Sequence, residues 1–416
     1  MSEAPIPAPA PRTGRPEPDR PRPSALPVGV IVALVAVVGL NLRASMGSLP
    51  PLLDEIDRDL GLSSTAAGLL TSVAIAFMGL CAPAGQRLGA RIGPELATGV
   101  LMLVLAGAGL VRALPLPAPL LFVSAAVAGA AMGGCSALMP SLIAHHVPAI
   151  RGMTTGIYST GLALGVAVAA GTAVPLEGLL GDWRPALAFW GAVSAVTAAL
   201  WLLLVPALRG PRRRETDPTV PAVVVDHRMP WRSRTAWLVV GFTTTQMIIG
   251  FSGLAWITPL YVSLGLPAQE AANMFVLFQV VQVATMLTLP ALADRTPDRR
   301  PQLAVVVGCT IVGIVLLLVA PVTLAIPAMA LFGMGVGGGS TLGLVLITDV
   351  THTQTDGARL GAMVVLVAYL AGALGPFALG VLRDLTGGFE AGYALMLALS
   401  VVTFASLRAY GPGREL

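Results

Sequence analysis

Residues 27–50 read PVGVIVALVAVVGLNLRASMGSLP, an apolar run with a single charged side chain, Arg43. A helix needs about 20 apolar residues to cross the roughly 30 Å hydrocarbon core of a bilayer, and this run is long enough. It is also too long for the core of a signal peptide, and no small-residue cleavage site is evident. The stretch therefore predicts a first membrane helix that is retained in the protein.

Eleven further apolar stretches of similar length follow, separated by short polar breaks. Together the twelve cover residues 27–50, 65–86, 95–114, 118–144, 153–174, 185–206, 236–262, 270–292, 302–321, 325–349, 358–382 and 390–409. The chain is 55% hydrophobic and only 11% charged, whereas about 25% of residues are charged in soluble domains. We therefore expect an all-α membrane protein with twelve transmembrane helices.

All 25 basic residues are arginines, and their distribution predicts the orientation of the helices. Cytoplasmic loops carry an excess of basic residues. If the N-terminus is cytoplasmic, 20 arginines fall on the cytoplasmic side and four, namely Arg58, Arg112, Arg184 and Arg383, fall in the outer loops. The sequence thus predicts a multi-pass protein of the cell membrane with both termini in the cytoplasm.

One long polar linker, residues 207–235, divides the helices six and six, as expected for an internal repeat. Pro51-Leu52 recurs as Pro259-Leu260 at an offset of 208 residues, and Gly178 and Asp182 recur as Gly380 and Asp384 at an offset of 202. We expect a cavity between two homologous bundles. The predicted organisation is a disordered tail (1–26), a first bundle (27–206), the cytoplasmic linker (207–235), a second bundle (236–410) and a short tail (411–416).

The loops after the second and eighth helices resemble the signature G-x-L-a-D-R-x-G of the major facilitator superfamily. The second loop keeps Leu292, Asp294 and Arg295, and the first keeps Leu88, Arg91 and Gly93 but has Ala90 in place of the aspartate. Within that superfamily the chain is similar to the cyanate and 2-nitroimidazole transporter family. The stretches that carry this similarity include Asn41-Leu42-Arg43, Asp59 to Ser63, Gly156-Ile157-Tyr158, Trp183-Arg184, Gly375-Pro376 and Leu385-Thr386-Gly387, together with Gln246, Trp256 and Tyr369.

The resemblance implies the major facilitator fold, two pseudo-symmetric six-helix bundles that move a small polar or anionic, cyanate-like solute by alternating access. Transport would be secondary active or facilitative. An exporter of small heteroaromatic compounds or drugs such as nitroimidazoles, in the same fold, stays an alternative. The signature implies gating roles for Arg91, Asp294 and Arg295. The expected partners are the small-molecule substrate and membrane lipid, without nucleic acid, and the protein is expected to be monomeric.

Arg43 is the ionisable side chain that the sequence places well inside a membrane helix. An arginine at the bilayer centre costs about 2.5 to 3.5 kcal/mol on insertion scales, so its position needs an explanation. One explanation is an anion-binding site in the cavity between the halves. The other is a side chain that snorkels outward to Asp54 or Asp57. The resemblance favours the anion site.

The further candidates for substrate binding are Asn41, Ser45, Gln246, Trp256 and Tyr369. For Asn41, Ser45 and Gln246 the alternative role is a hydrogen bond between helices. Asn41 and Arg43 are two residues apart, about 200° around a helix, so both can line one cavity only if the helix is locally irregular. Trp256 and Tyr369 become candidates through the resemblance.

Patterns typical of enzymes are missing from the sequence, and we expect no catalytic residue, metal site or cofactor. His145 and His146 are predicted to form a solvated loop pair, and Asp349 is predicted to be a helix-end residue. The glycine run from Gly333 to Gly339 lacks the Lys-Ser/Thr ending of a phosphate loop and indicates close helix packing instead. A membrane-embedded enzyme or sensor that binds without translocating is the alternative of another class.

Overall fold

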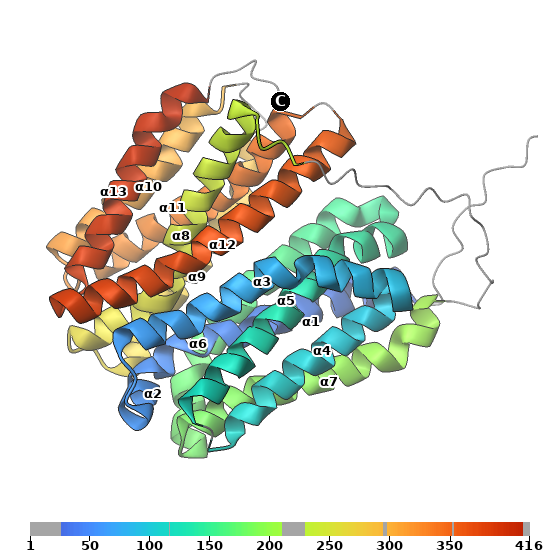
Figure 1. Ribbon diagram of the computed structural model, residues 1–416, viewed down its shortest axis with the longest axis horizontal. Helices are drawn as coiled ribbons and strands as arrows, with labels where there is room; N and C mark the ends of the chain where they lie inside the picture. Colours follow the sequence, from blue (N-terminus) through green and yellow to red (C-terminus); the bar gives the residue numbers. More distant parts are fainter. Residues whose placement is uncertain (1–25, 116, 210–228, 294–297, 352, 411–416) are drawn as a thin grey trace, which may run out of the picture.

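The computed structural model describes residues 26–115, 117–209, 229–293, 298–351 and 353–410 (Figure 1). Within these residues, twelve helices are long and apolar enough to cross a membrane. This confirms the prediction of an all-α membrane protein with twelve spans. The predicted tails, apart from Leu26, and most of the predicted linker lie outside the described residues.

The first six spans form one bundle and the last six form another, side by side in Figure 1. The spans of the first bundle, here the N half, are α1 (Val28–Gly47), α3 (Ser64–Ile92), α4 (Pro94–Leu110), α5 (Ala118–His146), α6 (Arg151–Leu180) and α7 (Trp183–Arg209). Those of the second, the C half, are α8 (Arg234–Ser263), α9 (Ala268–Ala293), α10 (Arg300–Val319), α11 (Ala325–Asp349), α12 (Gln354–Thr386) and α13 (Glu390–Ser406). We call the end where α7 stops and α8 starts the linker end, and the opposite end the far end.

Short elements complete the N half. Three of them are 3₁₀ turns, at Pro50–Leu52 (η1), Val111–Ala113 (η2) and Pro148–Ile150 (η3). The fourth is the short helix α2 (Leu53–Leu60) at the far end. In the C half, one further 3₁₀ turn, Leu407–Ala409 (η4), follows α13. Gly61 ends α2 with a φ of 62°, a left-handed conformation that glycine adopts without strain. The Ser63 hydroxyl then accepts a hydrogen bond from the Ala66 N–H, 3.2 Å away, and caps the start of α3.

Glycines permit the closest helix crossings. A side chain added at Gly165 in α6 would overlap the backbone of Leu40 in α1. In the C half, side chains added at Gly333 and Gly337 of α11 would overlap the backbone of α9, at Phe278 in the first case. The glycine run of α11 is therefore a packing surface, as the sequence predicts. The helices within each half pack closely against one another.

Candidate functional site

Arg43 lies at the boundary between the halves, where it contacts side chains of the C half. Its Nη2 atom donates a hydrogen bond to the phenol oxygen of Tyr369 in α12, at 3.3 Å. The guanidinium carbon lies 5.9 Å from the centroid of the Phe251 ring in α8, and the Phe251 and Tyr369 rings are also 5.9 Å apart. One charged side chain of α1 thus meets two helices of the other half.

The charge of Arg43 has no acidic partner among the described residues. Its Nε atom is buried and forms no hydrogen bond. Asp54 and Asp57, the partners that snorkelling would require, interact electrostatically with Arg383 instead. An arginine has five N–H donors, and only one of those of Arg43 is bonded within the described protein. The remaining donors are available to a ligand.

Tyr158 adds a fourth side chain to this group, and we call Arg43, Tyr158, Phe251 and Tyr369 the central cluster. The Tyr158 hydroxyl, in α6, hydrogen-bonds the Ser136 hydroxyl at 3.3 Å and lies within electrostatic range of Arg43 and Tyr369. The sequence pointed to Tyr158 only as part of the Gly-Ile-Tyr stretch and gave it no role. Aromatic faces and one cation are thereby gathered where the halves meet.

Asn41 and Ser45 face away from the central cluster. Asn41 is 1% exposed; its Nδ2 donates to Thr197 at 2.9 Å, and its Oδ1 accepts from Ser194 at 2.5 Å. Because α1 is an unbroken helix, residues two apart point in nearly opposite directions. The structure therefore gives Asn41 the interhelical role, towards α7, that was its alternative.

The contacts described for Gln246 and Trp256, both in α8, are with residues other than Arg43. Gln246 is buried against Gly339 of α11, and its Oε1 atom has no hydrogen-bond partner. The Trp256 indole donates to the carbonyl of Pro376 at 2.9 Å and packs near Gly68 of α3. Trp256 thus belongs to the contact between the halves nearer the far end.

Contacts between the two halves also occur at the far end itself. The Asp384 carboxylate of α12 accepts hydrogen bonds from the backbone N–H groups of Ser64 and Thr65 at the start of α3, at 3.0 and 2.7 Å. At another pair of helices, the Gln269 side chain of α9 donates to the carbonyl of Gly171 in α6, at 3.3 Å. These contacts hold the far ends of the halves together.

Of the predicted gating residues, the structure describes only Arg91, which is exposed in the last turn of α3 at the linker end. Asp294 and Arg295 lie outside the described residues. Asp349 ends α11 as predicted and binds Arg299, with Nε and Oδ2 2.8 Å apart.

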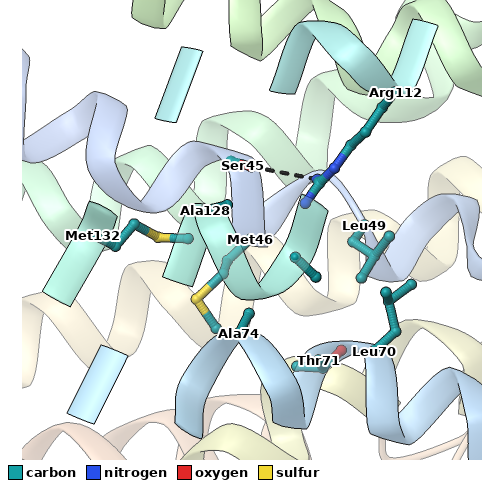
Figure 2. Close-up of a pocket in the computed structure, with 10 residues that line it drawn as sticks. Ser45, Met46, Leu49, Leu70, Thr71, Ala74, Arg112, Ala128 and Met132 are labelled. Carbon is teal, nitrogen blue, oxygen red and sulfur yellow. Dashed lines mark hydrogen bonds between the residues drawn. The ribbon is translucent and has the colours of Figure 1, made fainter. Parts of the chain in front are cut away.

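One sequence prediction about a polar side chain is wrong, and another side chain points in a direction that the sequence does not predict. His146 is not solvated, because its ring lies 3.2 Å from the Glu95 carboxylate and both side chains are largely buried. Arg112, which the sequence puts in an outer loop, lies in η2 between α4 and α5, and its side chain is buried, 5% exposed, and turns into the N half. It donates to Ser124 at 2.9 Å. It also donates to Ser45 at 3.4 Å, as Figure 2 shows. In both cases the packing of neighbouring helices decides where the side chain goes.

The sequence profile of the Major Facilitator Superfamily matches residues 31–376. The chain belongs to that superfamily. It is 29% identical to an uncharacterized transporter of Bacillus subtilis strain 168 over 91% of this chain and 92% of the relative. It is 27% identical to the cyanate transport protein of Escherichia coli strain K12, over 89% and 96%. It is 29% identical to the 2-nitroimidazole transporter of the same strain, over 87% and 90%.

Solved transporters share the fold. A bacterial homologue of the human lysosomal transporter Spinster, in an inward-facing and unoccupied conformation, superposes with a TM-score of 0.76 at 15% identity, covering 94% of this chain and 98% of that one. A D-xylose–proton symporter gives 0.75 at 17% identity, covering 94% and 100%. This member of the superfamily is a membrane transporter of small solutes and not an enzyme.

Proposed function

We propose that this transporter carries a small polar or anionic solute of the cyanate kind, by secondary active or facilitative transport, and that Arg43 binds it. The observation that carries the proposal is the position of Arg43. Its guanidinium spans the boundary between the halves, has a buried and unbonded Nε atom and lacks an acidic partner among the described residues. A solute that supplies the missing negative charge fits this position.

Physical chemistry supports an anion at this point. A cation held in a membrane helix costs about 2.5 to 3.5 kcal/mol on insertion scales, and a bound anion would offset part of that cost. Hydrogen bonds between a guanidinium and an anion are charge-assisted and can be paired, so they are about twice as strong as neutral ones. The relative named as a cyanate transport protein agrees with this chemistry.

The positions of the contacts between the halves support alternating access. The described hydrogen bonds that join the halves link Arg43 to Tyr369, Asp384 to the start of α3, and α6 to α9 at Gln269. We place the far end outside the cell, because the arginine distribution predicts cytoplasmic termini. The contacts then close the outer side, and substrate exchange would occur from the cytoplasmic side until the halves rock about the central cluster. Arg91, Asp294 and Arg295 would latch the linker end in the opposite state.

A second candidate is export of small heteroaromatic compounds. The central cluster presents the ring of Phe251 near the cation of Arg43, with Tyr158 and Tyr369 beside it. Flat aromatic solutes stack on such rings, and one relative is named as a 2-nitroimidazole transporter. The two candidates share one site and differ in whether the ligand's charge or its ring makes the main contact.

Counterflow in proteoliposomes tests the proposal, because it requires translocation but no driving ion. Vesicles loaded with unlabelled solute are diluted into labelled cyanate or labelled 2-nitroimidazole. We expect cyanate to accumulate in vesicles that contain the parent protein and not in those that contain Arg43→Gln. Accumulation of 2-nitroimidazole alone, unaffected by Arg43→Gln, would favour the second candidate. Cyanate counterflow at the parent rate in Arg43→Gln would remove Arg43 from the site.

A further inference from the structure

Arg112 is buried, has no acidic partner among the described residues, and points into the N half. It lies in η2, directly after α4 at the far end. A long basic side chain at a helix end normally snorkels towards the nearby water. Arg112 does the reverse, because its Nε donates to Ser124 at 2.9 Å. Ser124 is the seventh residue of α5, about 9 Å along the helix from its start at 1.5 Å per residue.

Two serine hydroxyls are the acceptors that the described protein offers to Arg112. Nε donates to Ser124 and Nη1 to Ser45, and no ion pair accompanies these bonds. Three of the five N–H donors, among them both on Nη2, are left without a protein acceptor. A guanidinium keeps its charge throughout the physiological pH range. A buried charge without a counter-charge is strongly unfavourable, so the structure calls for an anion at this place.

A small cavity lies against the guanidinium. Figure 2 shows Arg112 reaching from η2 towards Ser45, with Met46 and Ala128 beyond it. The cavity has a volume of about 20 Å³, somewhat more than the roughly 10 to 15 Å³ that one water molecule needs. Its walls carry the hydroxyl-bearing residues Ser45 and Thr71 and are otherwise apolar. The cavity therefore has room for a particle of at least the size of one water molecule.

We propose that this cavity binds one monovalent anion of halide size, which is chloride under ordinary conditions. Arg112 would neutralise the anion, and the hydroxyls of Ser45 and Thr71 would be further donors. A small cavity favours a small anion, and a single cation matches a single negative charge. The apolar wall suits a halide, since it needs few directed hydrogen bonds.

This site is distinct from the central cluster. Ser45 lies two residues from Arg43 on the unbroken helix α1, so the two side chains leave α1 on nearly opposite sides. Arg43 faces the C half, whereas the lining of the cavity comes from α1, α3, α5 and η2 of the N half. The chloride proposed here is therefore a resident ion of one half and not the transported solute.

Thermal unfolding of the purified full-length protein tests the proposal. The midpoint is measured in sodium chloride, sodium bromide and sodium gluconate at constant ionic strength. We expect it to rise with chloride and bromide along a saturating curve, because a ligand that binds only the folded state stabilises it by mass action. Arg112→Gln should abolish the rise, and Arg43→Gln should retain it. General salt effects cancel when variant and parent are compared.

Several results would overturn the proposal. A parent midpoint independent of chloride would mean that the cavity holds water only. A chloride-dependent rise of the midpoint that persists in Arg112→Gln would place the anion elsewhere. A rise that is lost in Arg43→Gln but not in Arg112→Gln would also place it elsewhere, and this result would leave the proposed function standing. If Arg112→Gln does not fold, Ser45→Ala should raise the half-saturating chloride concentration about two- to tenfold, for loss of one hydrogen bond. Crystals soaked in bromide should show an anomalous peak within hydrogen-bond distance of Arg112, and its absence would count against the site.

Discussion

Replacement of Arg43 by alanine should lower substrate affinity about ten- to a hundredfold. The guanidinium has one neutral partner, the Tyr369 hydroxyl at 3.3 Å, and a buried Nε without any. An anion bound there would gain charge-assisted hydrogen bonds worth roughly 1.5 to 3 kcal/mol, and each 1.4 kcal/mol is a factor of ten in affinity. Arg43→Lys should recover only part of the loss, because lysine keeps the charge but has no planar fork.

Tyr369→Phe separates the ligand contact from the contact between the halves. Its hydrogen bond with Arg43 is long and has a neutral acceptor, so its loss should cost about 0.5 to 1.5 kcal/mol and change affinity by about two- to tenfold at most. The ring, which packs near Phe251, stays in place in this variant. A much larger effect of Tyr369→Phe than of Arg43→Ala would mean that the tyrosine hydroxyl, and not the cation, binds the solute.

The assay is isothermal titration of folded, purified protein with the solute identified by counterflow. Arg58→Ala is the matched control, because Arg58 is an arginine of the same half that is exposed on α2 at the far end. The control should bind like the parent. If Arg43→Ala binds with unchanged affinity but unfolds at a lower temperature, Arg43 is a structural residue and the anion site does not exist.

Three further predictions concern topology, gating and the far end. A single cysteine at Arg299, in a cysteine-free background, should react with a membrane-impermeant reagent only from the cytoplasm. Labelling from outside intact cells would mean that the predicted topology is inverted. Asp294→Asn should slow turnover more than any change at Ala90 while binding persists, which transport and titration on the same samples would check. Asp384→Ala removes both acceptors at the start of α3 and should weaken far-end closure by about 1 to 2 kcal/mol. Spin-label distances across the far end should then broaden towards an open population, and an unchanged distribution would show that other contacts hold it shut.

The twelve helices could be predicted because their cause is local. A bilayer requires about 20 apolar residues in each span, and those residues are consecutive in the sequence. The regular periodicity of α1 also determines that Asn41 and Arg43 diverge. Which of the two faces the C half depends on how α1 packs against α6 and α7, and periodicity does not contain that information.

The partners of the polar side chains could not be predicted, because they come from distant parts of the chain. Tyr369 is 326 residues away from Arg43, and Glu95 is 51 residues away from His146. Arg112 illustrates the limit most clearly. Hydropathy places it near the outer end of an apolar run, but the direction of its side chain is decided by Ser124 and Ser45 on two other helices.

Arg43 and Arg112 both lack an acidic partner among the described residues, but their neighbourhoods differ, and this difference bears on which of them can serve transport. Arg112 is enclosed by helices of one half, and its hydrogen bonds stay within that half. Rocking of the halves as rigid bodies leaves such a neighbourhood unchanged, so an anion there need never be released. Arg43 contacts α8 and α12 of the other half, and rocking must alter those contacts. In the proposed cycle, a counter-charge bound to Arg43 would therefore be exposed to exchange once per turnover, as a transported solute has to be.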